Sequence, residues 1–208
     1  MDVKYSFSLN IVMQTMVNGM ATDSLPENKE NLCRNRKQTD NNMATKDGFI
    51  IRPIKETDNA QMARLIRCVI DEFGVSRTGT VYDDPVTDCI SQSVENVNAE
   101  YWVIDYGGEI QGGCGFYPTK GLPGKCAEIV KYYLSPAVRG KGLGGMILDL
   151  IVRRAKGAGY TSLYIETFPS FGKAIDMYKE RGFQLLDGQL GDSGHTATSI
   201  FLLKVLTD

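Results

Sequence analysis

The sequence predicts an α+β domain in which a mixed, mostly antiparallel sheet is flanked by helices. Two observations lead to this prediction. Strand-like runs joined by glycine turns fill the middle of the chain, and strand and helix patterns then alternate to the end. Antiparallel neighbours need only short turns, whereas helices between later strands can cover the faces of a sheet. A chain of 208 residues with 42% apolar and 23% charged residues is expected to form one such domain.

The first elements are predicted from apolar spacing. Residues 49–54 form an apolar, strand-like run. A helix should follow, with Thr57 as its N-cap and apolar residues at helical spacing over residues 62–73. A looser helical pattern covers residues 86–97. Residues 75–85 then remain as a polar loop between the two helices.

The centre of the chain predicts a β-hairpin. Residues 101–105, which are mostly aromatic and β-branched, and residues 109–117 flank Gly107-Gly108. Glycine pairs supply the positive φ angles that tight hairpin turns need. We therefore expect these two strands to be antiparallel neighbours, with a further strand over residues 127–134.

A glycine-rich turn follows that strand and opens an amphipathic helix over residues 143–156. The turn reads Arg139-Gly140-Lys141-Gly142-Leu143-Gly144. Glycine lets the backbone approach a ligand closely, the first helical N–H groups lack intrahelical acceptors, and the helix dipole adds about half a positive charge. The turn therefore predicts a site for a phosphorylated ligand.

The rest of the chain completes the alternation. It predicts a strand over residues 163–167, a short helix over 173–181, and strands over 183–186 and 198–206.

The glycine turn fits two kinds of phosphate site. One is the dinucleotide fingerprint G-x-G-x-x-G, formed by Gly140, Gly142 and Gly145, with Glu166 about twenty residues further on. Five residues between strand and first glycine, and the short chain that follows, count against a doubly wound sheet. A helix start with spare glycines is a third, functionally silent interpretation.

The other kind is a coenzyme A site. The turn has the form Gln/Arg-x-x-Gly-x-Gly/Ala after a strand that ends in Leu134 and a proline, and residues 174–183 read A-x-x-x-Y-x-x-x-G-F. With both motifs in this order, the chain resembles the GNAT superfamily of acyl-CoA-dependent N-acyltransferases over about residues 49–205. The resemblance implies a sheet whose central strands splay apart.

The resemblance also implies how the co-substrate acetyl-CoA is held. Main-chain atoms of the strand before the turn would bond the pantetheine arm and the thioester, and the turn would bind the pyrophosphate. The implied cofactor-binding residues are Tyr132, Tyr133, Leu134, Arg139, Gly140, Lys141, Gly142, Leu143 and Gly144. Many members carry an asparagine seven residues before the motif tyrosine, where this chain has Phe171, so that contact should differ here.

Proton transfer is assigned to three catalytic candidates. Tyr178 matches the general acid of the superfamily, because a phenol can donate a proton at neutral pH. Glu128 matches the base of the histone-acetylating branch and Glu166 that of the ribosomal-protein branch. Burial would raise either pKa toward neutrality. His195, the only histidine, is a further possible base.

The implied activity is acetyl transfer to a primary amine of a small molecule, by direct attack on the thioester. In the superfamily, the region that matches residues 75–85 shapes the acceptor pocket. Two alternatives stay open: acetylation of a protein N-terminus or lysine, and a coenzyme A sensor without turnover.

Composition excludes several other classes. A net charge of -2 with interspersed signs offers no face for nucleic acid. Five widely spaced cysteines without a C-x-x-C pair indicate neither a disulfide framework nor a metal site. No apolar run reaches the roughly 18 residues of a membrane span, and no signal peptide is evident. We expect a cytoplasmic protein without membrane partners. A homodimer is one possible assembly.

The N-terminal segment has a different composition. Residues 8–48 contain no aromatic side chain and many asparagines. Such a segment buries too little apolar surface to order itself. We therefore predict a disordered extension over residues 1–47 and the N-acetyltransferase domain over residues 48–208.

Overall fold

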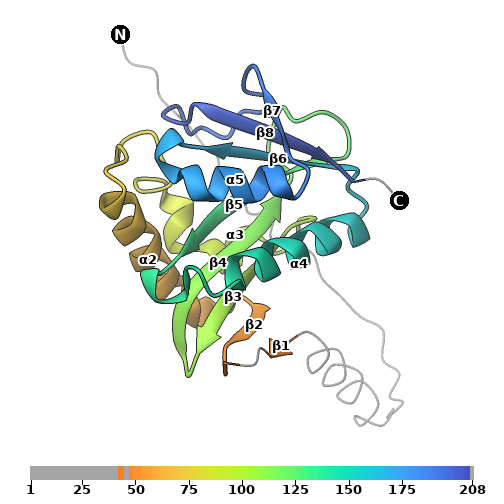
Figure 1. The fold of residues 1–208 in the computed structure, drawn as a ribbon. Helices are drawn as coiled ribbons and strands as arrows, with labels where there is room; N and C mark the ends of the chain where they lie inside the picture. Colours follow the sequence, from red (N-terminus) through yellow and green to blue (C-terminus); the bar gives the residue numbers. More distant parts are fainter. Residues whose placement is uncertain (1–41, 45–46, 207–208) are drawn as a thin grey trace, which may run out of the picture. The chain divides into compact units, whose positions relative to one another are not determined.

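The computed structural model describes residues 42–44 and 47–206. The predicted extension lies outside the described residues, except for residues 42–44 and 47. Within these residues, eight strands form one sheet in the order β1-β2-β3-β4-β5-β6-β8-β7 (Figure 1). The strands are β1 Met43–Ala44, β2 Ile50–Pro53, β3 Glu100–Tyr106, β4 Glu109–Tyr117, β5 Cys126–Leu134, β6 Ser162–Thr167, β7 Gln184–Leu186 and β8 Ile200–Val205.

Neighbouring strands are antiparallel except for β5 and β6, so the predicted mixed, mostly antiparallel sheet is confirmed. The helices are α2 Asn59–Glu72, α3 Ile90–Ser93, α4 Leu143–Gly157 and α5 Gly172–Glu180. Short 3₁₀ turns cover Glu56–Asp58, Pro85–Asp88, Pro136–Val138 and Pro169–Phe171. In the part of the chain that the structure describes, no helix is long and apolar enough to cross a bilayer.

Two apolar clusters hold the helices to the sheet. One joins α4, through Leu143, Ile147 and Ile151, to side chains of the central strands. The other joins α2, through Met62 and Ile66, to the opposite face. Burial of each such side chain contributes about 1.5–3 kcal/mol, so amphipathic spacing decides where these helices pack.

Two local predictions were wrong. Thr57 is not the N-cap, because a 3₁₀ turn over Glu56–Asp58 precedes α2. The predicted helix over residues 86–97 is reduced to the 3₁₀ turn Pro85–Asp88 and the single turn α3. Cys89 lies between them outside the helical region, with φ -139° and ψ 45°, and therefore interrupts the hydrogen-bond ladder.

The sheet opens between β5 and β6. These parallel strands pair only over residues 126–128 of β5, which face residues 162–164 of β6. Beyond Glu128, β5 pairs with no strand on its β6 side among the described residues, and the two strands diverge in Figure 1. The predicted splay of the central strands is therefore confirmed, and it leaves main-chain groups of β5 free to bind a ligand.

A bulge in β5 lies at the same place. The register with β4 shifts between Gly113 and Gly115, and Lys131 has a positive φ of 49°. The Tyr101 hydroxyl donates to the Lys131 carbonyl at 2.6 Å. A Cβ added to Gly113 or Gly115 would lie 2.6 Å from atoms of the Tyr101 ring. The glycines of β4 thus leave room for the tyrosine that supports the bulge.

Candidate active site

A cleft of about 1580 Å³ lies where β5 and β6 separate. Arg139, glycines of the turn and Tyr178 line this cleft. Glu128 and His195 line it as well. The predicted phosphate site and the predicted proton-transfer groups therefore share one cavity.

The glycine turn presents unpaired backbone donors. Gly140 and Gly142 have φ angles of 76° and 78°, which glycine adopts readily. The first hydrogen bond of α4 runs from Met146 N to Gly142 O at 3.1 Å. The N–H groups of residues 142–145 have no acceptor among the described residues. Four orphan donors at a helix N-terminus form an anion site.

The side chains of the turn contact other parts of the protein. The Arg139 guanidinium donates to Leu134 O at 2.9 Å and to both oxygens of Glu72, at 2.5 and 2.8 Å. It therefore fastens the turn to α2. Lys141 Nζ lies 5.3 Å from the centre of the Phe49 ring, and Leu143 is buried. The unpaired donors at this turn are thus main-chain groups, while the side chains of Arg139 and Lys141 contact other residues.

Arg181 is a cation that the motif analysis did not identify. It follows α5 and lines the cleft, and its Nε donates to Asp149 at 2.8 Å. A Cβ added to Gly145 would collide with its guanidinium. Arg181 therefore lies directly on the first turn of α4, beside the orphan donors. Gly145 was likewise absent from the predicted cofactor-binding residues.

Tyr178 lies deep in the cleft. It is 3% exposed, and its ring packs against Tyr132 and Phe183, with centroids 6.1 and 5.9 Å away. Its hydroxyl has no hydrogen-bond partner within residues 42–44 and 47–206. Burial raises the pKa of Tyr178 well above its ordinary value, so the phenol keeps its proton. A buried donor without a partner is consistent with a ligand that supplies one.

The residues before the turn form the walls. The Tyr132 hydroxyl lies 3.7 Å from Met177 Sδ, and a Cβ on Gly144 would stand 2.6 Å from that hydroxyl. Phe171 packs edge-on against Tyr133, with ring centroids 6.2 Å apart. It also contacts the rings of Phe73 and Phe168. Phe171, at the position for which the resemblance implied an asparagine, therefore contributes an aromatic wall.

Glu128 is a buried carboxyl with one free oxygen. It is 5% exposed, and the Thr119 hydroxyl donates to Oε2 at 2.5 Å. Oε1 has no donor among the described residues. Burial raises the pKa of Glu128 to about 7, the nearby Glu166 adds to this effect, and the Thr119 hydrogen bond opposes it.

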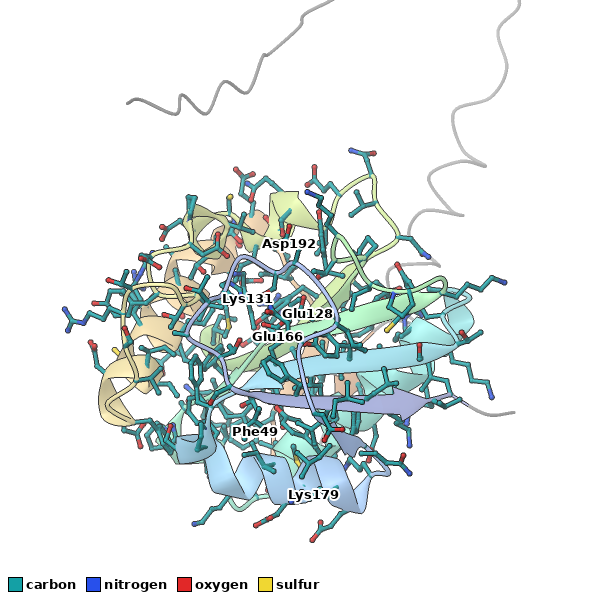
Figure 2. The ribbon with its side chains drawn as sticks, turned by 90° about the horizontal axis from the view of Figure 1, so that it is seen from above. Phe49, Glu128, Lys131, Glu166, Lys179 and Asp192 are labelled. Carbon is teal, nitrogen blue, oxygen red and sulfur yellow. The ribbon has the colours of Figure 1, made fainter. Side chains whose placement is uncertain are left out.

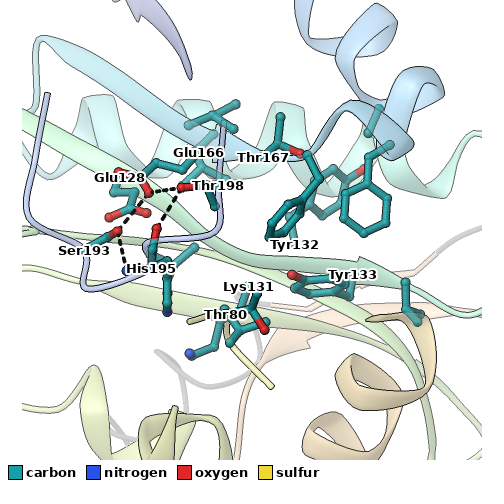
Figure 3. Close-up of a pocket in the computed structure, with 18 of the residues that line it drawn as sticks. Thr80, Glu128, Lys131, Tyr132, Tyr133, Glu166, Thr167, Ser193, His195 and Thr198 are labelled. Carbon is teal, nitrogen blue, oxygen red and sulfur yellow. Dashed lines mark hydrogen bonds between the residues drawn. The ribbon is translucent and has the colours of Figure 1, made fainter. Parts of the chain in front are cut away.

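Glu166 has a different environment on β6. Tyr164 and Gln189 donate to Oε1 at 3.1 and 3.0 Å. Ser193 and Thr198 donate to Oε2 at 2.8 and 2.9 Å, as the dashed lines in Figure 3 show. Both oxygens are therefore occupied, and the carboxylate anchors the loop between β7 and β8.

An ion pair that the motifs did not reveal, between Asp84 and Lys131, also lines the cleft that contains Glu128. Asp84 Oδ2 is 2.6 Å from Lys131 Nζ and 3.7 Å from His195 Nε2. Burial opposes ionisation of Asp84, but His195 and the charge of Lys131 hold its pKa below the ordinary value. The signal for Lys131 was a lysine within a strand that, apart from Glu128, has no other charged residue. Figure 2 shows Glu128, Lys131 and Glu166 beneath the loop that carries Asp192.

Metal ligation has no support in the described ranges. Among residues 42–44 and 47–206, no three His, Cys, Asp or Glu side chains are arranged to hold a metal ion. The absence of a metal stays a prediction from the sequence.

A mostly antiparallel sheet that splays beside an anion-binding turn fits an acyl-CoA-dependent acyltransferase, and it does not fit the doubly wound sheet of the dinucleotide interpretation. The model of the acetyltransferase (GNAT) family matches residues 64–183, and the chain belongs to this family. The resemblance seen in the sequence is thereby confirmed. The protein is an acyl-CoA-dependent N-acyltransferase.

Named relatives and solved structures agree with this assignment. The chain is 34% identical over 158 residues to the uncharacterized N-acetyltransferase YjgM of Escherichia coli K12, covering 76% of this chain and 95% of the relative. A GNAT acetyltransferase from Staphylococcus aureus Mu50 shares the fold, with a TM-score of 0.67 at 17% identity, covering 76% of this chain and 99% of that one. The structure of yncA from Salmonella typhimurium, described with its cofactor acetyl-CoA, also shares the fold. Its TM-score is 0.62 at 18% identity, and the match covers 76% of this chain and 94% of that one.

Proposed function

We propose that the protein transfers the acetyl group of acetyl-CoA to a primary amine of a small molecule, by direct attack of the amine on the thioester. One observation supports this most strongly. The cleft that begins at the orphan N–H groups of residues 142–145 contains a carboxyl group with a free oxygen and a pKa of about 7. A base with a pKa near the working pH is well matched to taking a proton from an amine.

The residues present fit acetyl-CoA. The N–H groups of residues 142–145 would bind its diphosphate, and Arg181 would add a positive charge beside them. Backbone groups of Tyr132, Tyr133 and Leu134 would bind the pantetheine arm, because this part of β5 lacks a partner toward β6. Acetyl-CoA supplies the activated carbonyl. Arg139, Lys141 and Leu143 would act by shaping the turn rather than by touching phosphate.

Glu128 is the proposed base, in preference to Glu166. Glu128 Oε1 is free to accept a proton, whereas four donors occupy the oxygens of Glu166. His195 is a weaker candidate because its Nε2 faces Asp84. Tyr178 would return a proton to the departing thiolate, since its hydroxyl is protonated and unpartnered.

A small acceptor is favoured over a polypeptide. The loop between β7 and β8 lies over Glu128 and Glu166 (Figure 2), and the hydrogen bonds to Glu166 hold it there. A covered pocket admits a compact amine more readily than an extended chain. The cytoplasmic location and the homodimer stay predictions from the sequence.

An acceptor screen tests the proposal. The full chain would be incubated with acetyl-CoA and either small primary amines or peptides with free N-termini and lysines. Thiol release gives the rate and mass spectrometry identifies the N-acetyl product. Acetylation of small amines is expected. Acetylation of peptides alone, or bound acetyl-CoA without turnover of any amine, would contradict the proposal.

Tyr178→Phe is expected to lower kcat about 100-fold, the lower end of the usual contribution of a positioned acid. The change removes only a hydroxyl that has no partner, so the fold and the Kd of acetyl-CoA should stay close to wild type. Stopped thiol-release assays and calorimetry measure the two quantities. Tyr160→Phe is the matched control, because it removes a buried hydroxyl that bonds Asn98 O at 2.6 Å outside the cleft. Full activity of Tyr178→Phe would exclude the tyrosine as the acid.

A further inference from the structure

Lys131 is an unusual residue among those that line the cleft. Its side chain is 7% exposed, although a lysine is seldom buried, and its φ of 49° is unfavourable for a residue with a Cβ. Such backbone conformations cost about 1–3 kcal/mol and gather at functional sites. Burial and conformation together indicate that this ammonium is held in place for a purpose beyond packing.

The ammonium has one donor to spare. Lys131 Nζ donates to Asp84 Oδ2 at 2.6 Å and to Thr87 Oγ1 at 3.1 Å. An ammonium carries three N–H groups, and the third has no acceptor in the described part of the chain. Asp84 cannot take a further cation easily, because its Oδ1 accepts from Val86 N at 2.9 Å and its Oδ2 already faces Lys131 and His195.

The carboxyl that faces the same space is the complement of this donor. Glu128 Oε1 is a buried acceptor without a partner, three residues before Lys131 on β5, and both residues line the cleft (Figure 3). Apolar side chains also lie near Lys131. Val81 accepts a hydrogen bond from Thr87 through its carbonyl, and Val81 and Ile90 line the cleft with buried side chains.

We propose that the acceptor is an α-amino acid with an apolar side chain, whose amine faces Glu128 and whose carboxylate binds the free N–H of Lys131. This inference rests on the proposed function and specifies its substrate. An amine without a carboxylate would leave the Lys131 donor buried and unpaired, which a site penalises strongly. Lys131 is thus a specificity-determining residue, and Asp84 and Thr87 position it.

Matched acceptors test the proposal. L-Leucine would be compared with two amines that lack the carboxylate, 3-methylbutylamine and L-leucinamide. The amine of L-leucinamide is less basic and therefore more often neutral, so a preference for L-leucine over it cannot come from a more reactive amine. The kcat/KM for L-leucine is expected to exceed both by about 10- to 100-fold, the range for a hydrogen bond to a charged group. L-Phenylalanine and 2-phenylethylamine form a second pair with the same expectation.

In the Lys131→Met variant, the kcat/KM values for L-leucine and leucinamide should become nearly equal, mainly because KM for L-leucine rises. The double variant Lys131→Met with Asp84→Asn restores the charge balance if the single variant folds poorly. The proposal would be overturned if wild-type protein used leucinamide or 3-methylbutylamine as well as it uses L-leucine. It would also be overturned if the variants kept the wild-type preference in kcat/KM for L-leucine over leucinamide. Acetylation of other amines alone would overturn it and leave the proposed function intact. Failure to bind acetyl-CoA in calorimetry would remove both.

Discussion

Glu128→Gln is expected to lower kcat by about 100- to 10,000-fold, the range for loss of a positioned general base. Glutamine keeps the shape and can still bond Thr119, but it cannot take a proton. The wild-type kcat/KM should rise with pH through about 7 and then level off, because the base acts only after Glu128 has lost its own proton. The variant should lack this inflection. Rates with a saturating amine and a full pH profile measure both effects.

Stability separates a chemical effect from unfolding. The pKa of Glu128 is raised in the folded protein, so ionising this carboxyl destabilises the fold progressively from its unfolded pKa, near 4.3, up to about 7. Glu128→Gln should therefore melt at pH 8 no lower than wild type. Glu166→Gln is the comparison: it weakens the anchor of the loop between β7 and β8 and keeps an inflection, which should move to lower pH because the charge of Glu166 no longer raises the pKa of Glu128. An unchanged pH profile in Glu128→Gln would show that another group is the base.

Gly142→Asp is expected to weaken acetyl-CoA binding by at least about 100-fold. The new carboxylate would stand among the orphan N–H groups of residues 142–145 and repel a diphosphate there, where two close charges interact by several kcal/mol. The fold should tolerate the change. A Cβ at Gly142 meets no atom within 4 Å, and aspartate is one of the few residues that visit a φ near 78°. Calorimetric titration with coenzyme A gives the Kd.

Gly142→Asn is the control for this experiment. Asparagine has the same shape as aspartate and adopts the left-handed conformation at least as readily, but it carries no charge. It should weaken binding far less than aspartate does. Equal losses for both variants would point to backbone strain, and no loss for aspartate would place the diphosphate elsewhere.

Local chemistry made much of the fold predictable. The turn at residues 107–108, the glycine bend before α4 and the apolar spacing of α2 and α4 each depend on neighbours in sequence. The helix predicted over residues 86–97 was wrong because the sequence pattern there did not reveal the local backbone conformation. Its apolar spacing gave no indication that Cys89 leaves the helical region or that Asn96 takes a φ of 58°.

The residues of the candidate site could be predicted only where a sequence motif includes them. Glu128 and Tyr178 were found through the superfamily resemblance, and the structure places both in one cleft. Contacts between distant residues could not be seen. Arg139 bonds Glu72, which lies 67 residues earlier, and Lys131 bonds Asp84 across 47 residues. Such partners depend on how β5 packs against α2 and the loop before α3, and only the folded chain shows them.

We infer that the main-chain amides at the start of α4 bind the diphosphate of acetyl-CoA and direct the thioester to Glu128 and Tyr178. A crystal structure of the protein with bound coenzyme A tests this most directly. We predict diphosphate oxygens within hydrogen-bond distance of the backbone nitrogens of residues 142–145, with the thiol end beside Tyr178. A diphosphate bound away from this turn, or a thiol end outside the cleft that contains Glu128, would contradict the account.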